Sequence, residues 1–268
     1  MRLQVLGTAA GGGVPQWNCA CPGCAGARAH PARARRHASI AVQTAERVVV
    51  VNATPDIAAQ LEDCPWIAAD RAAVPYVALT DAELDHTLGL LRLREAGELH
   101  VAATSAVRRA LRPVEEILRP YAPIRWRPLP EAVTVSDKRP RYADGPGRGW
   151  VSALRFTDGG RTLVYAPAMG AWTPELEAAC ESADCVILDG TFWDDEEPRR
   201  TGISEKTATQ MGHLPVEATM RRLAGLRARC LYTHLNNTNP LVDPGSGRHK
   251  VLEELGLEVA ADGMVIDL

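Results

Sequence analysis

The sequence has neither a long apolar run nor a segment that resembles a secretion signal. No stretch approaches the roughly 20 apolar residues that a membrane-spanning helix needs. The first residues, Met1-Arg2-Leu3-Gln4-Val5-Leu6-Gly7, lack the apolar core of a signal peptide and are predicted to form a strand that leads into a glycine-rich turn. We therefore expect a cytoplasmic protein with no membrane partner.

The chain also lacks the excess of positive charge that a polyanionic partner favours. Its net charge is −3 over 268 residues. Arg33, Arg35 and Arg36 form a small basic cluster, but no aromatic residues alternate with them to make a stacking platform for bases. We interpret this cluster as solvated surface and expect no nucleic-acid partner. The oligomeric state stays open, and a homodimer is among the states that the sequence allows.

The number and spacing of the cysteines do not favour a disulfide framework. There are seven, an odd number, and three of them crowd into Cys19-Ala20-Cys21-Pro22-Gly23-Cys24. Thiolates at this spacing can surround one ion, and zinc prefers four tetrahedral ligands. We predict a structural zinc that ties the turn at residues 11–13 to the body of the protein. The fourth ligand stays open among His30, His37 and a distant residue such as Asn237, and three ligand-free thiols are the alternative.

Strand-like and helical patterns alternate along the chain and predict an α/β sandwich. We expect a single domain over residues 1–268, because the loop at 136–149, rich in Asp, Gly, Pro and Arg, is too short for a linker between independent domains. The predicted strands are 3–6, 39–42, 48–52, 76–79, 151–156, 162–165, 185–188, 230–233 and 258–260. The predicted helices are 56–62, 88–95, 106–111, 174–181, 216–223 and 249–255.

Acidic residues and histidines follow three of the predicted strands. Thr80-Asp81-Ala82-Glu83-Leu84-Asp85-His86 places three carboxylates and an imidazole together, a group that repels itself unless a cation or protons neutralise it. An acid-rich helix start is an equally good interpretation of this segment alone. Asp189 and His234 end two further strands, and α/β folds place their sites at such strand ends. Together the three segments predict a metal site.

These segments resemble a known superfamily and a family within it. The run from Thr80 to His86 is similar to a degenerate form of the metallo-β-lactamase motif T-H-x-H-x-D-H. More specifically, the sequence resembles the coenzyme PQQ synthesis protein B family over nearly the whole chain. The runs that carry this resemblance include Gly7-Thr8-Ala9-Ala10-Gly11-Gly12-Gly13, Pro15-Gln16-Trp17-Asn18-Cys19, Asp85-His86-Thr87, Asp189-Gly190-Thr191, Met211-Gly212-His213-Leu214-Pro215 and His234-Leu235-Asn236-Asn237-Thr238-Asn239-Pro240. The chain is shorter than typical members around residues 130–150, which places the substrate in more doubt than the chemistry.

The resemblance implies a four-layered αββα sandwich and a modified metal site. Asp81 and Glu83 stand where the hydrolases of the superfamily have the two early histidines of the first zinc site. Asp85, His86 and His234 remain, with Asp189 nearby, and we expect these four to be the metal ligands. Two histidines with one carboxylate suit non-haem Fe(II) and O₂ chemistry, and zinc can substitute because it binds more tightly.

Further roles are assigned around this centre. His213 is a candidate for proton transfer or substrate contact, with a hydrogen-bonding loop histidine as the alternative. We expect Asp81, Glu83, Asn236 and Asn237 to contact the substrate. The acidic run Trp193-Asp194-Asp195-Glu196-Glu197 is interpreted as a solvated loop.

Three functions are compatible with these features. The resemblance implies an iron-dependent hydroxylase that uses O₂ on a small tyrosine- or peptide-derived precursor in the synthesis of PQQ or a related cofactor or natural product. The second is a metal-dependent hydrolase or phosphodiesterase, as in most relatives with this fold. The third is a non-catalytic carrier that transports PQQ or a precursor. The hydroxylase needs Fe(II), the hydrolase needs a second metal, and the carrier needs no turnover.

Overall fold

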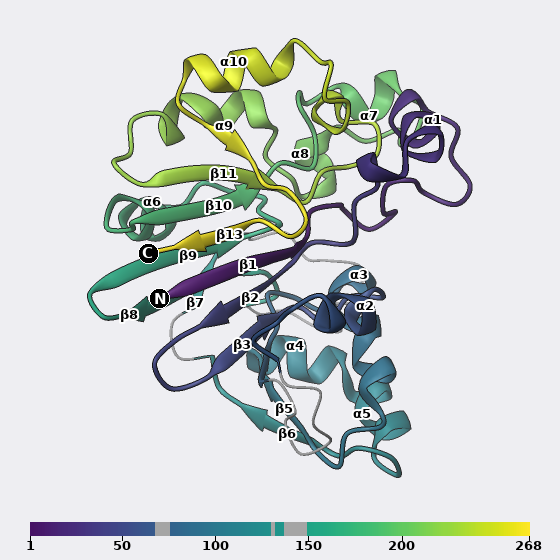
Figure 1. Ribbon diagram of the computed structural model, residues 1–268, viewed down its shortest axis with the longest axis vertical. Coiled ribbons are helices and arrows are strands. Elements are labelled where there is room, and N and C mark those ends of the chain that lie inside the picture. The colour runs from purple at the N-terminus through teal and green to yellow at the C-terminus, as the bar shows by residue number, and fades with distance from the viewer. Residues whose placement is uncertain (68–75, 130–131, 137–148) are drawn as a thin grey trace.

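Two mixed β-sheets face each other at the centre of the molecule (Figure 1). The computed structural model describes residues 1–67, 76–129, 132–136 and 149–268. The first sheet has the order β13-β1-β2-β3-β4-β5-β6 and the second the order β12-β11-β10-β9-β8-β7. Residues 137–148, most of the loop that the sequence predicted, lie outside the described residues.

The strands of the first sheet come mainly from the N-terminal half of the chain. They are β1 (Arg2–Gly7), β2 (Ser39–Gln43), β3 (Val48–Val51), β4 (Tyr76–Ala78), β5 (Leu99–Ala102), β6 (Ile124–Arg127) and β13 (Val265–Asp267). Those of the second sheet are β7 (Ala132–Thr134), β8 (Ser152–Asp158), β9 (Arg161–Ala166), β10 (Cys185–Asp189), β11 (Arg229–Thr233) and β12 (Glu258–Val259).

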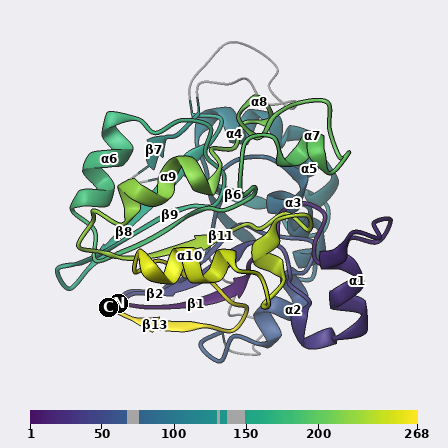
Figure 2. The ribbon, with the colours of Figure 1, turned by 90° about the horizontal axis from the view of Figure 1, so that it is seen from above.

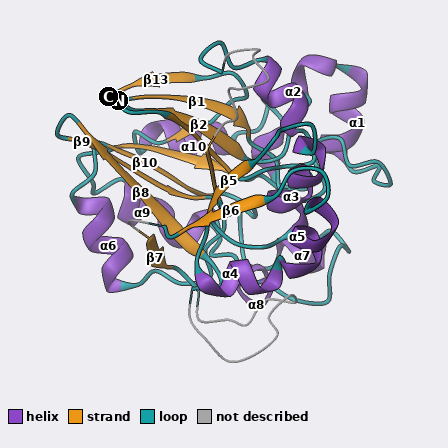
Figure 3. Cartoon of the chain, turned by 90° about the horizontal axis from the view of Figure 1, so that it is seen from below, coloured by secondary structure: helices purple, strands orange, loops and turns teal. Residues whose placement is uncertain are grey.

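Helices line the outer faces of both sheets (Figures 2 and 3). The α-helices are α1 (Pro22–Ala29), α2 (Ile57–Glu62), α3 (Leu84–Thr87), α4 (Ser105–Ala110), α5 (Arg112–Leu118), α6 (Pro174–Glu181), α7 (Glu197–Arg200), α8 (Ala208–Met211), α9 (Val216–Leu223) and α10 (Arg248–Glu254). The 3₁₀-helices are η1 (Pro31–Arg33), η2 (Leu88–Leu93) and η3 (Pro240–Val242).

The burial of alternate strand residues defines the layers. In β10, Cys185 and Ile187 belong to the cluster between the two sheets, together with Leu3 and Ile40 of the first sheet. Val186 points the other way, into the cluster beneath α6, α9 and α10. This alternation follows from the two-residue period of a strand. Two further clusters pack η2, α4, α5 and α2 against the outer face of the first sheet. The predicted four-layered αββα sandwich is confirmed.

The nine predicted strands all exist, but four others were missed. Of these, β5 and β6 lie at one end of the first sheet, β13 lies at its other edge, and β7 is the edge of the second. All four are only three or four residues long, and β6, β7 and β13 are also edge strands, so they give weak periodicity. The predicted helix at 88–95 is instead the 3₁₀-helix η2, and the short α3 directly before it was not predicted. Helices α1, α5, α7 and α8 were also missed.

The strand ends that carry the acids and histidines meet at one edge. Strands β10 and β11 are parallel, with Asp189 opposite Thr233, so His234 follows directly beside Asp189. The N-terminal turn joins them, because Ala9 forms a bridge with Leu235 and Ala10 N donates to Leu235 O at 2.9 Å. Among the described residues, no helix is long and apolar enough to cross a membrane.

A glycine allows η2, which follows directly after the helix that bears His86, to pack closely. Gly89 N donates to Ala53 O at 2.8 Å, and a Cβ at Gly89 would collide with the backbone oxygen of Thr54. We predict that Gly89→Ala lowers the free energy of unfolding by about 1–3 kcal/mol, since backbone must move to admit the methyl group. Thermal and urea denaturation measure this loss. Gly97→Ala is the matched control, because a Cβ there meets nothing within 4 Å. Equal stability of the two variants would contradict the packing argument.

Candidate metal centre

Three side chains converge at the edge where the two sheets meet. His234 Nε2 lies 3.2 Å and His86 Nε2 lies 3.7 Å from Asp85 Oδ2. The two rings lie edge to face with centroids 5.2 Å apart. One ligand atom from each residue lies within 4.8 Å of the others, so the set can share one ion. Asp85, His86 and His234 are thus brought together as the sequence predicted.

A buried carboxylate fixes the orientation of His86. Asp81 Oδ2 lies 2.7 Å from His86 Nδ1, and both side chains are almost fully buried. A carboxylate cannot donate, so Nδ1 carries the proton and the lone pair of Nε2 faces Asp85. His86 Nε2 is buried and has no hydrogen-bond partner among the described residues. A buried nitrogen acceptor without a partner, backed by a carboxylate, fits a metal ligand.

His234 is held by the hydroxyl group of Thr191, which also binds Asp189. Thr191 Oγ1 lies 2.5 Å from Asp189 Oδ1 and 2.8 Å from His234 Nδ1. Because the hydroxyl donates its one proton to the carboxylate, it accepts from His234 Nδ1, which again leaves Nε2 as the free nitrogen. His234 adopts φ of 60°, a left-handed conformation that is costly for a residue other than glycine. The backbone bond from Leu235 N to Thr8 O, at 2.8 Å, helps to hold it there.

The predicted role of Asp189 as a metal ligand stays a prediction, because its oxygens have other partners in the structure. Its Oδ2 accepts from Met169 N at 2.9 Å and from His213 Nδ1 at 2.7 Å, and its Oδ1 is held by Thr191. Both oxygens are therefore engaged by protein donors. The ligand atoms of Asp189 group with His213 and His234 rather than with Asp85 and His86. Its observed contacts orient His213 and, through Thr191, His234.

His213 lies directly beside His234, one of the candidate metal ligands. Its ring stacks on that of His234 with centroids 5.7 Å apart and meets Phe192 edge to face. Since Nδ1 donates to Asp189, the other ring nitrogen is the one left to exchange a proton or contact a ligand. This position is compatible with the role predicted for His213.

Buried negative charge dominates the electrostatics of the centre. Burial lowers the pKa of His86, but Asp81 and Asp85 outweigh it and raise that pKa to about 9. Burial opposes ionisation of Asp85, yet His86 and His234 hold the pKa of that carboxyl well below its usual range. Without a metal, this raised pKa favours a second proton on His86, at Nε2, and a cation that binds there must displace it.

Two of the predicted substrate contacts have other partners. Asp81 is fully buried behind His86, and its Oδ1 accepts from Glu83 N at 2.9 Å, so it positions the ring and does not face a substrate. Asn237 Nδ2 lies 3.1 Å from Cys19 Sγ, in the thiol cluster. Glu83 is exposed, and Asn236 is half-buried with its Nδ2 donating to Thr238 Oγ1 at 2.6 Å. For these two residues, substrate contact stays a prediction.

The acidic run after β10 is not the solvated loop that we expected. Trp193 and Glu197 are each 1% exposed. Glu197 accepts from Trp193 N at 2.6 Å and from Thr238 Oγ1 at 2.7 Å, so it joins the loop after β10 to the loop after β11. Burial raises the pKa of Glu197 to about 7. Only Asp194, Asp195 and Glu196 in this run are within reach of solvent.

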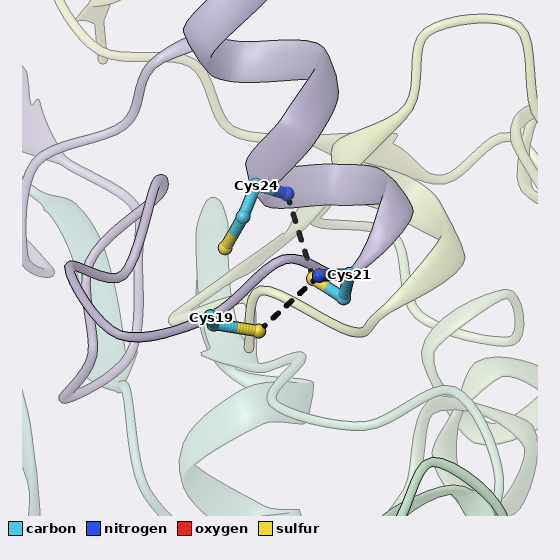
Figure 4. A group of neighbouring side chains, drawn as sticks. All are labelled: Cys19, Cys21 and Cys24. Carbon is cyan, nitrogen blue, oxygen red and sulfur yellow. Dashed lines mark hydrogen bonds between the residues drawn. The ribbon is translucent and has the colours of Figure 1, made fainter.

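The three cysteines of the N-terminal segment form a second cluster (Figure 4). Their sulfurs receive backbone N–H groups, from Gln16 to Cys24 Sγ at 3.2 Å and from Cys21 to Cys19 Sγ at 3.4 Å. Burial and the neighbouring thiols raise the pKa of Cys24 to about 11, a cost that a bound cation removes. Such donors and such crowding fit a zinc-thiolate site.

Of the three candidates for the fourth zinc ligand, the structure places Asn237 beside these thiols. Its Nδ2 is 3.4 Å from Cys21 Sγ, and its backbone oxygen is 3.2 Å from the same sulfur. His37 is engaged elsewhere, because its Nδ1 lies 2.6 Å from Asp56 Oδ2. His30 is exposed and does not belong to the group of ligand atoms found among the described residues.

Thr191 is the functional residue that reasoning from the sequence missed. It was seen only as a part of the run Asp189-Gly190-Thr191. A hydroxyl two residues after a strand-end aspartate forms a local turn with that carboxylate, and this spacing was the available signal. Its second contact, with His234, joins residues 43 positions apart and leaves no trace in local sequence.

Comparisons with known proteins agree with this geometry. A model of the beta-lactamase superfamily domain matches residues 47–234. Coenzyme PQQ synthesis protein B from Azoarcus sp. (strain BH72) is 39% identical over 304 positions, covering 100% of both chains. That from Methylococcus capsulatus is 36% identical over 306 positions, again with full coverage of both.

Solved structures show the same similarity. Zn(2+)-bound PqqB from Methylobacterium extorquens has a TM-score of 0.89 at 31% identity and is covered in full, as is this chain. A diphosphatase from the PhnP family has a TM-score of 0.71 at 19% identity, covering 100% of this chain and 97% of its own. The second match concerns the fold alone.

The contact between Asp81 and His86 leads to a prediction about metal affinity. Asp81→Asn should weaken metal binding at the Asp85–His86–His234 centre by about 10- to 100-fold, because the ring loses the carboxylate that fixes its proton and direction. Competition with a chromophoric chelator measures the affinity. Glu83→Gln removes the same charge from an exposed side chain two residues away and should change the affinity by less than about threefold. Equal effects of both variants would show that only net charge matters.

The thiol cluster leads to a prediction about zinc content. Cys21→Ser should remove one zinc per chain and lower the melting temperature by roughly 5 °C or more, because metal binding stabilises the folded state. Elemental analysis and calorimetry give the two readouts. Cys64→Ser is the control, since Cys64 is buried outside the cluster and its loss should leave the zinc in place. A Cys21→Ser protein with full zinc and an unchanged melting temperature would contradict the assignment.

Proposed function

The chain belongs to the beta-lactamase superfamily and, within it, to the coenzyme PQQ synthesis protein B family, and from this premise we propose that it is a non-haem iron-dependent hydroxylase. The resemblance predicted from the sequence is thereby confirmed at the level of family and fold, which indicate a metal-dependent protein of PQQ synthesis. The reaction and the metal are the parts that we propose.

One observation carries the proposal: two imidazole nitrogens and one carboxylate oxygen converge, and carboxylates stand in place of the two early histidines of the superfamily motif. His86, His234 and Asp85 supply the three atoms. Positions 81 and 83, the places of the first zinc site in hydrolases of the superfamily, hold carboxylates, and Asp81 is turned away behind His86. A facial set of two histidines and one carboxylate leaves positions open and suits Fe(II).

The side chains around this set have separable tasks. Bound Fe(II) would supply the activation of O₂. Asp81 and Thr191 fix the two rings through Nδ1, and Asp189 anchors Thr191. His213, held by Asp189 at Nδ1, is placed to take or give a proton at its other nitrogen. We propose that the substrate is a small tyrosine- or peptide-derived precursor and that Glu83 and Asn236 contact it.

The second metal in this proposal is a structural zinc. Cys19, Cys21 and Cys24 would hold it, with Asn237 beside them. Three thiolates and a neighbouring amide leave no obvious position for a substrate, so this zinc would stabilise the N-terminal turn and take no part in the chemistry.

A hydrolase is the competing function, and one observation favours it. Asp189, His213 and His234 form a second group whose ligand atoms lie within 4.8 Å of one another and which shares His234 with the first. Two adjacent metal sites are what a two-metal hydrolase uses. The contacts of Asp189 with Met169, Thr191 and His213 count against this use, because they occupy both of its oxygens.

Reconstitution separates the alternatives. Protein freed of its active-site metal and reloaded with Fe(II) under anaerobic conditions should consume O₂ when the substrate is added, and the zinc-loaded form should not. His86→Ala and His234→Ala should each lower this uptake by at least about 100-fold, because each removes one ligand nitrogen. An oxygen electrode measures the uptake, and mass spectrometry of the product should find one added oxygen atom.

His100→Ala is the control, since this histidine lies on β5 beside Glu98 and outside the site. Circular dichroism checks that all three variants keep the fold. Phosphodiester hydrolysis by the zinc form, with no effect of Fe(II), would support the hydrolase instead. Tight binding of PQQ without turnover in either metal form would support the carrier.

A further inference from the structure

Glu197 is a buried acid that is not among the candidate metal ligands, and its two oxygens bind donors from different loops. Oε2 accepts from Trp193 N at 2.6 Å, and Oε1 accepts from Thr238 Oγ1 at 2.7 Å. Trp193 lies in the loop after β10, and Thr238 lies in the loop after β11, which begins with His234. A carboxylate that is 1% exposed and bonded to two loops restricts the hydroxyl that it binds.

The hydroxyl of Thr238 has one proton, and the position of that proton decides how Thr238 bonds to Asn236. An ionised carboxylate only accepts, so the proton points to Glu197 Oε1. Toward the Asn236 amide, Thr238 Oγ1 then has only lone pairs, and the group that lies 2.6 Å from it must be the NH2 group. The charge on Glu197 therefore determines which end of the Asn236 amide turns toward Thr238.

The other end of the Asn236 amide is free. Its Oδ1 makes no hydrogen bond with the described residues and is not one of their buried atoms that lack a partner, so it is within reach of solvent. The backbone of Asn236 is fixed, because its N donates to Thr191 O at 3.0 Å and its O accepts from Asn239 N at 2.9 Å. An accessible amide oxygen on this backbone, two residues after His234, can accept from an N–H or O–H group of a ligand.

A proton on Glu197 would change which group donates to which. Because Oε2 already accepts from Trp193 N, the proton would sit on Oε1 and donate to Thr238 Oγ1. The hydroxyl proton of Thr238 would then be free to donate to the amide oxygen of Asn236, while its second lone pair could still accept from the NH2 group. The orientation of the amide is thus defined only while Glu197 is ionised.

The pKa of Glu197 lies in the range where this change can occur. Burial raises the pKa to about 7, and the hydrogen bonds from Trp193 and Thr238 oppose this rise. The charged or titratable groups next to Glu197, to the ring of Trp193 and in the loop after β11 are Asp194, Arg200, Glu217, Arg248 and His234. Of these, Asp194 raises the pKa of Glu197 further and Arg200 lowers it.

We propose that Glu197 is a positioning residue that acts through the hydroxyl of Thr238 and turns the amide oxygen of Asn236 outward, as a fixed acceptor for a donor group of the substrate. A substrate that meets this oxygen has to bring an N–H or O–H group, such as an ammonium or a hydroxyl group. This role rests on the proposed function in one respect, the contact between Asn236 and the substrate. The hydrogen bonds from Asn236 to Glu197 need neither turnover nor a substrate, so they can be tested separately.

NMR of the Asn236 side chain in the zinc-loaded, full-length protein tests this role. Zinc is diamagnetic, and the loss of one signal in Asn236→Asp assigns the NH2 group. The nitrogen and proton chemical shifts of that group should move in a single step across neutral pH, with the midpoint at the pKa of Glu197, about 7. The step is expected because the amide becomes fixed when Glu197 ionises.

Three variants locate the cause of the step. Glu197→Gln keeps the shape but cannot ionise, so the step should disappear. Thr238→Val removes the hydroxyl at nearly constant shape; it should abolish the step and speed the exchange of the Asn236 NH2 protons with solvent by at least about threefold, as expected for the loss of one hydrogen bond. Thr238→Ser keeps the hydroxyl and should behave like the unaltered protein. Zinc content and melting temperature verify that each variant is folded.

A flat pH profile of Asn236 in the unaltered protein overturns the inference. A step that persists in Glu197→Gln also overturns it, because the step would then come from another group, such as His213. Equal behaviour of Thr238→Ser and Thr238→Val would show that the hydroxyl plays no part. If the step and its loss are found but the Fe(II) form consumes no O₂, the proposed function fails and the orientation of Asn236 by Glu197 stands.

Discussion

The centre depends on how its two imidazoles are held at the nitrogen that does not face the site. Asp81 accepts a hydrogen bond from Nδ1 of His86, and Thr191 Oγ1 accepts one from Nδ1 of His234. Both Nε2 atoms then point at Asp85, and neither ring can turn without losing a buried hydrogen bond. The strands, the turns that follow them and the layers on either side bring Asp81 and Thr191 to the same edge of the sandwich.

A high density of buried carboxylates follows from this arrangement. Asp81 and Asp189 are within 1% of complete burial, and Asp85 lies between two imidazoles. Each of the first two is compensated by hydrogen bonds from backbone and hydroxyl groups as well as by a ring. Ionised groups so far from water are tolerated only with such partners. Because protein donors already hold these carboxylates in place, the site suits a cation.

The sequence predicted most of the sandwich, because its central strands carry strong apolar periodicity and its strand ends carry unusual residues. For the same reason it predicted that Asp85, His86 and His234 come together, as the structure places them. Asp81 was misassigned because a residue next to a motif can lie in front of a ring or behind it, and only the fold decides. Glu197 was misjudged since an acid beside other acids looks solvated, whereas its two donors come from loops after different strands.

The loop after β11 has a consequence for how the two metal centres behave together. His234 begins this loop, and Asn237, three residues on, lies against the thiols of Cys19 and Cys21. A segment this short cannot shift at one end and stay fixed at the other. We therefore expect metal binding at the two candidate sites to be thermodynamically linked, so that each bound ion changes the affinity of the other site by the same factor. Oxidation of the thiols of Cys19 and Cys21 would then be expected to weaken ion binding at Asp85, His86 and His234 as well.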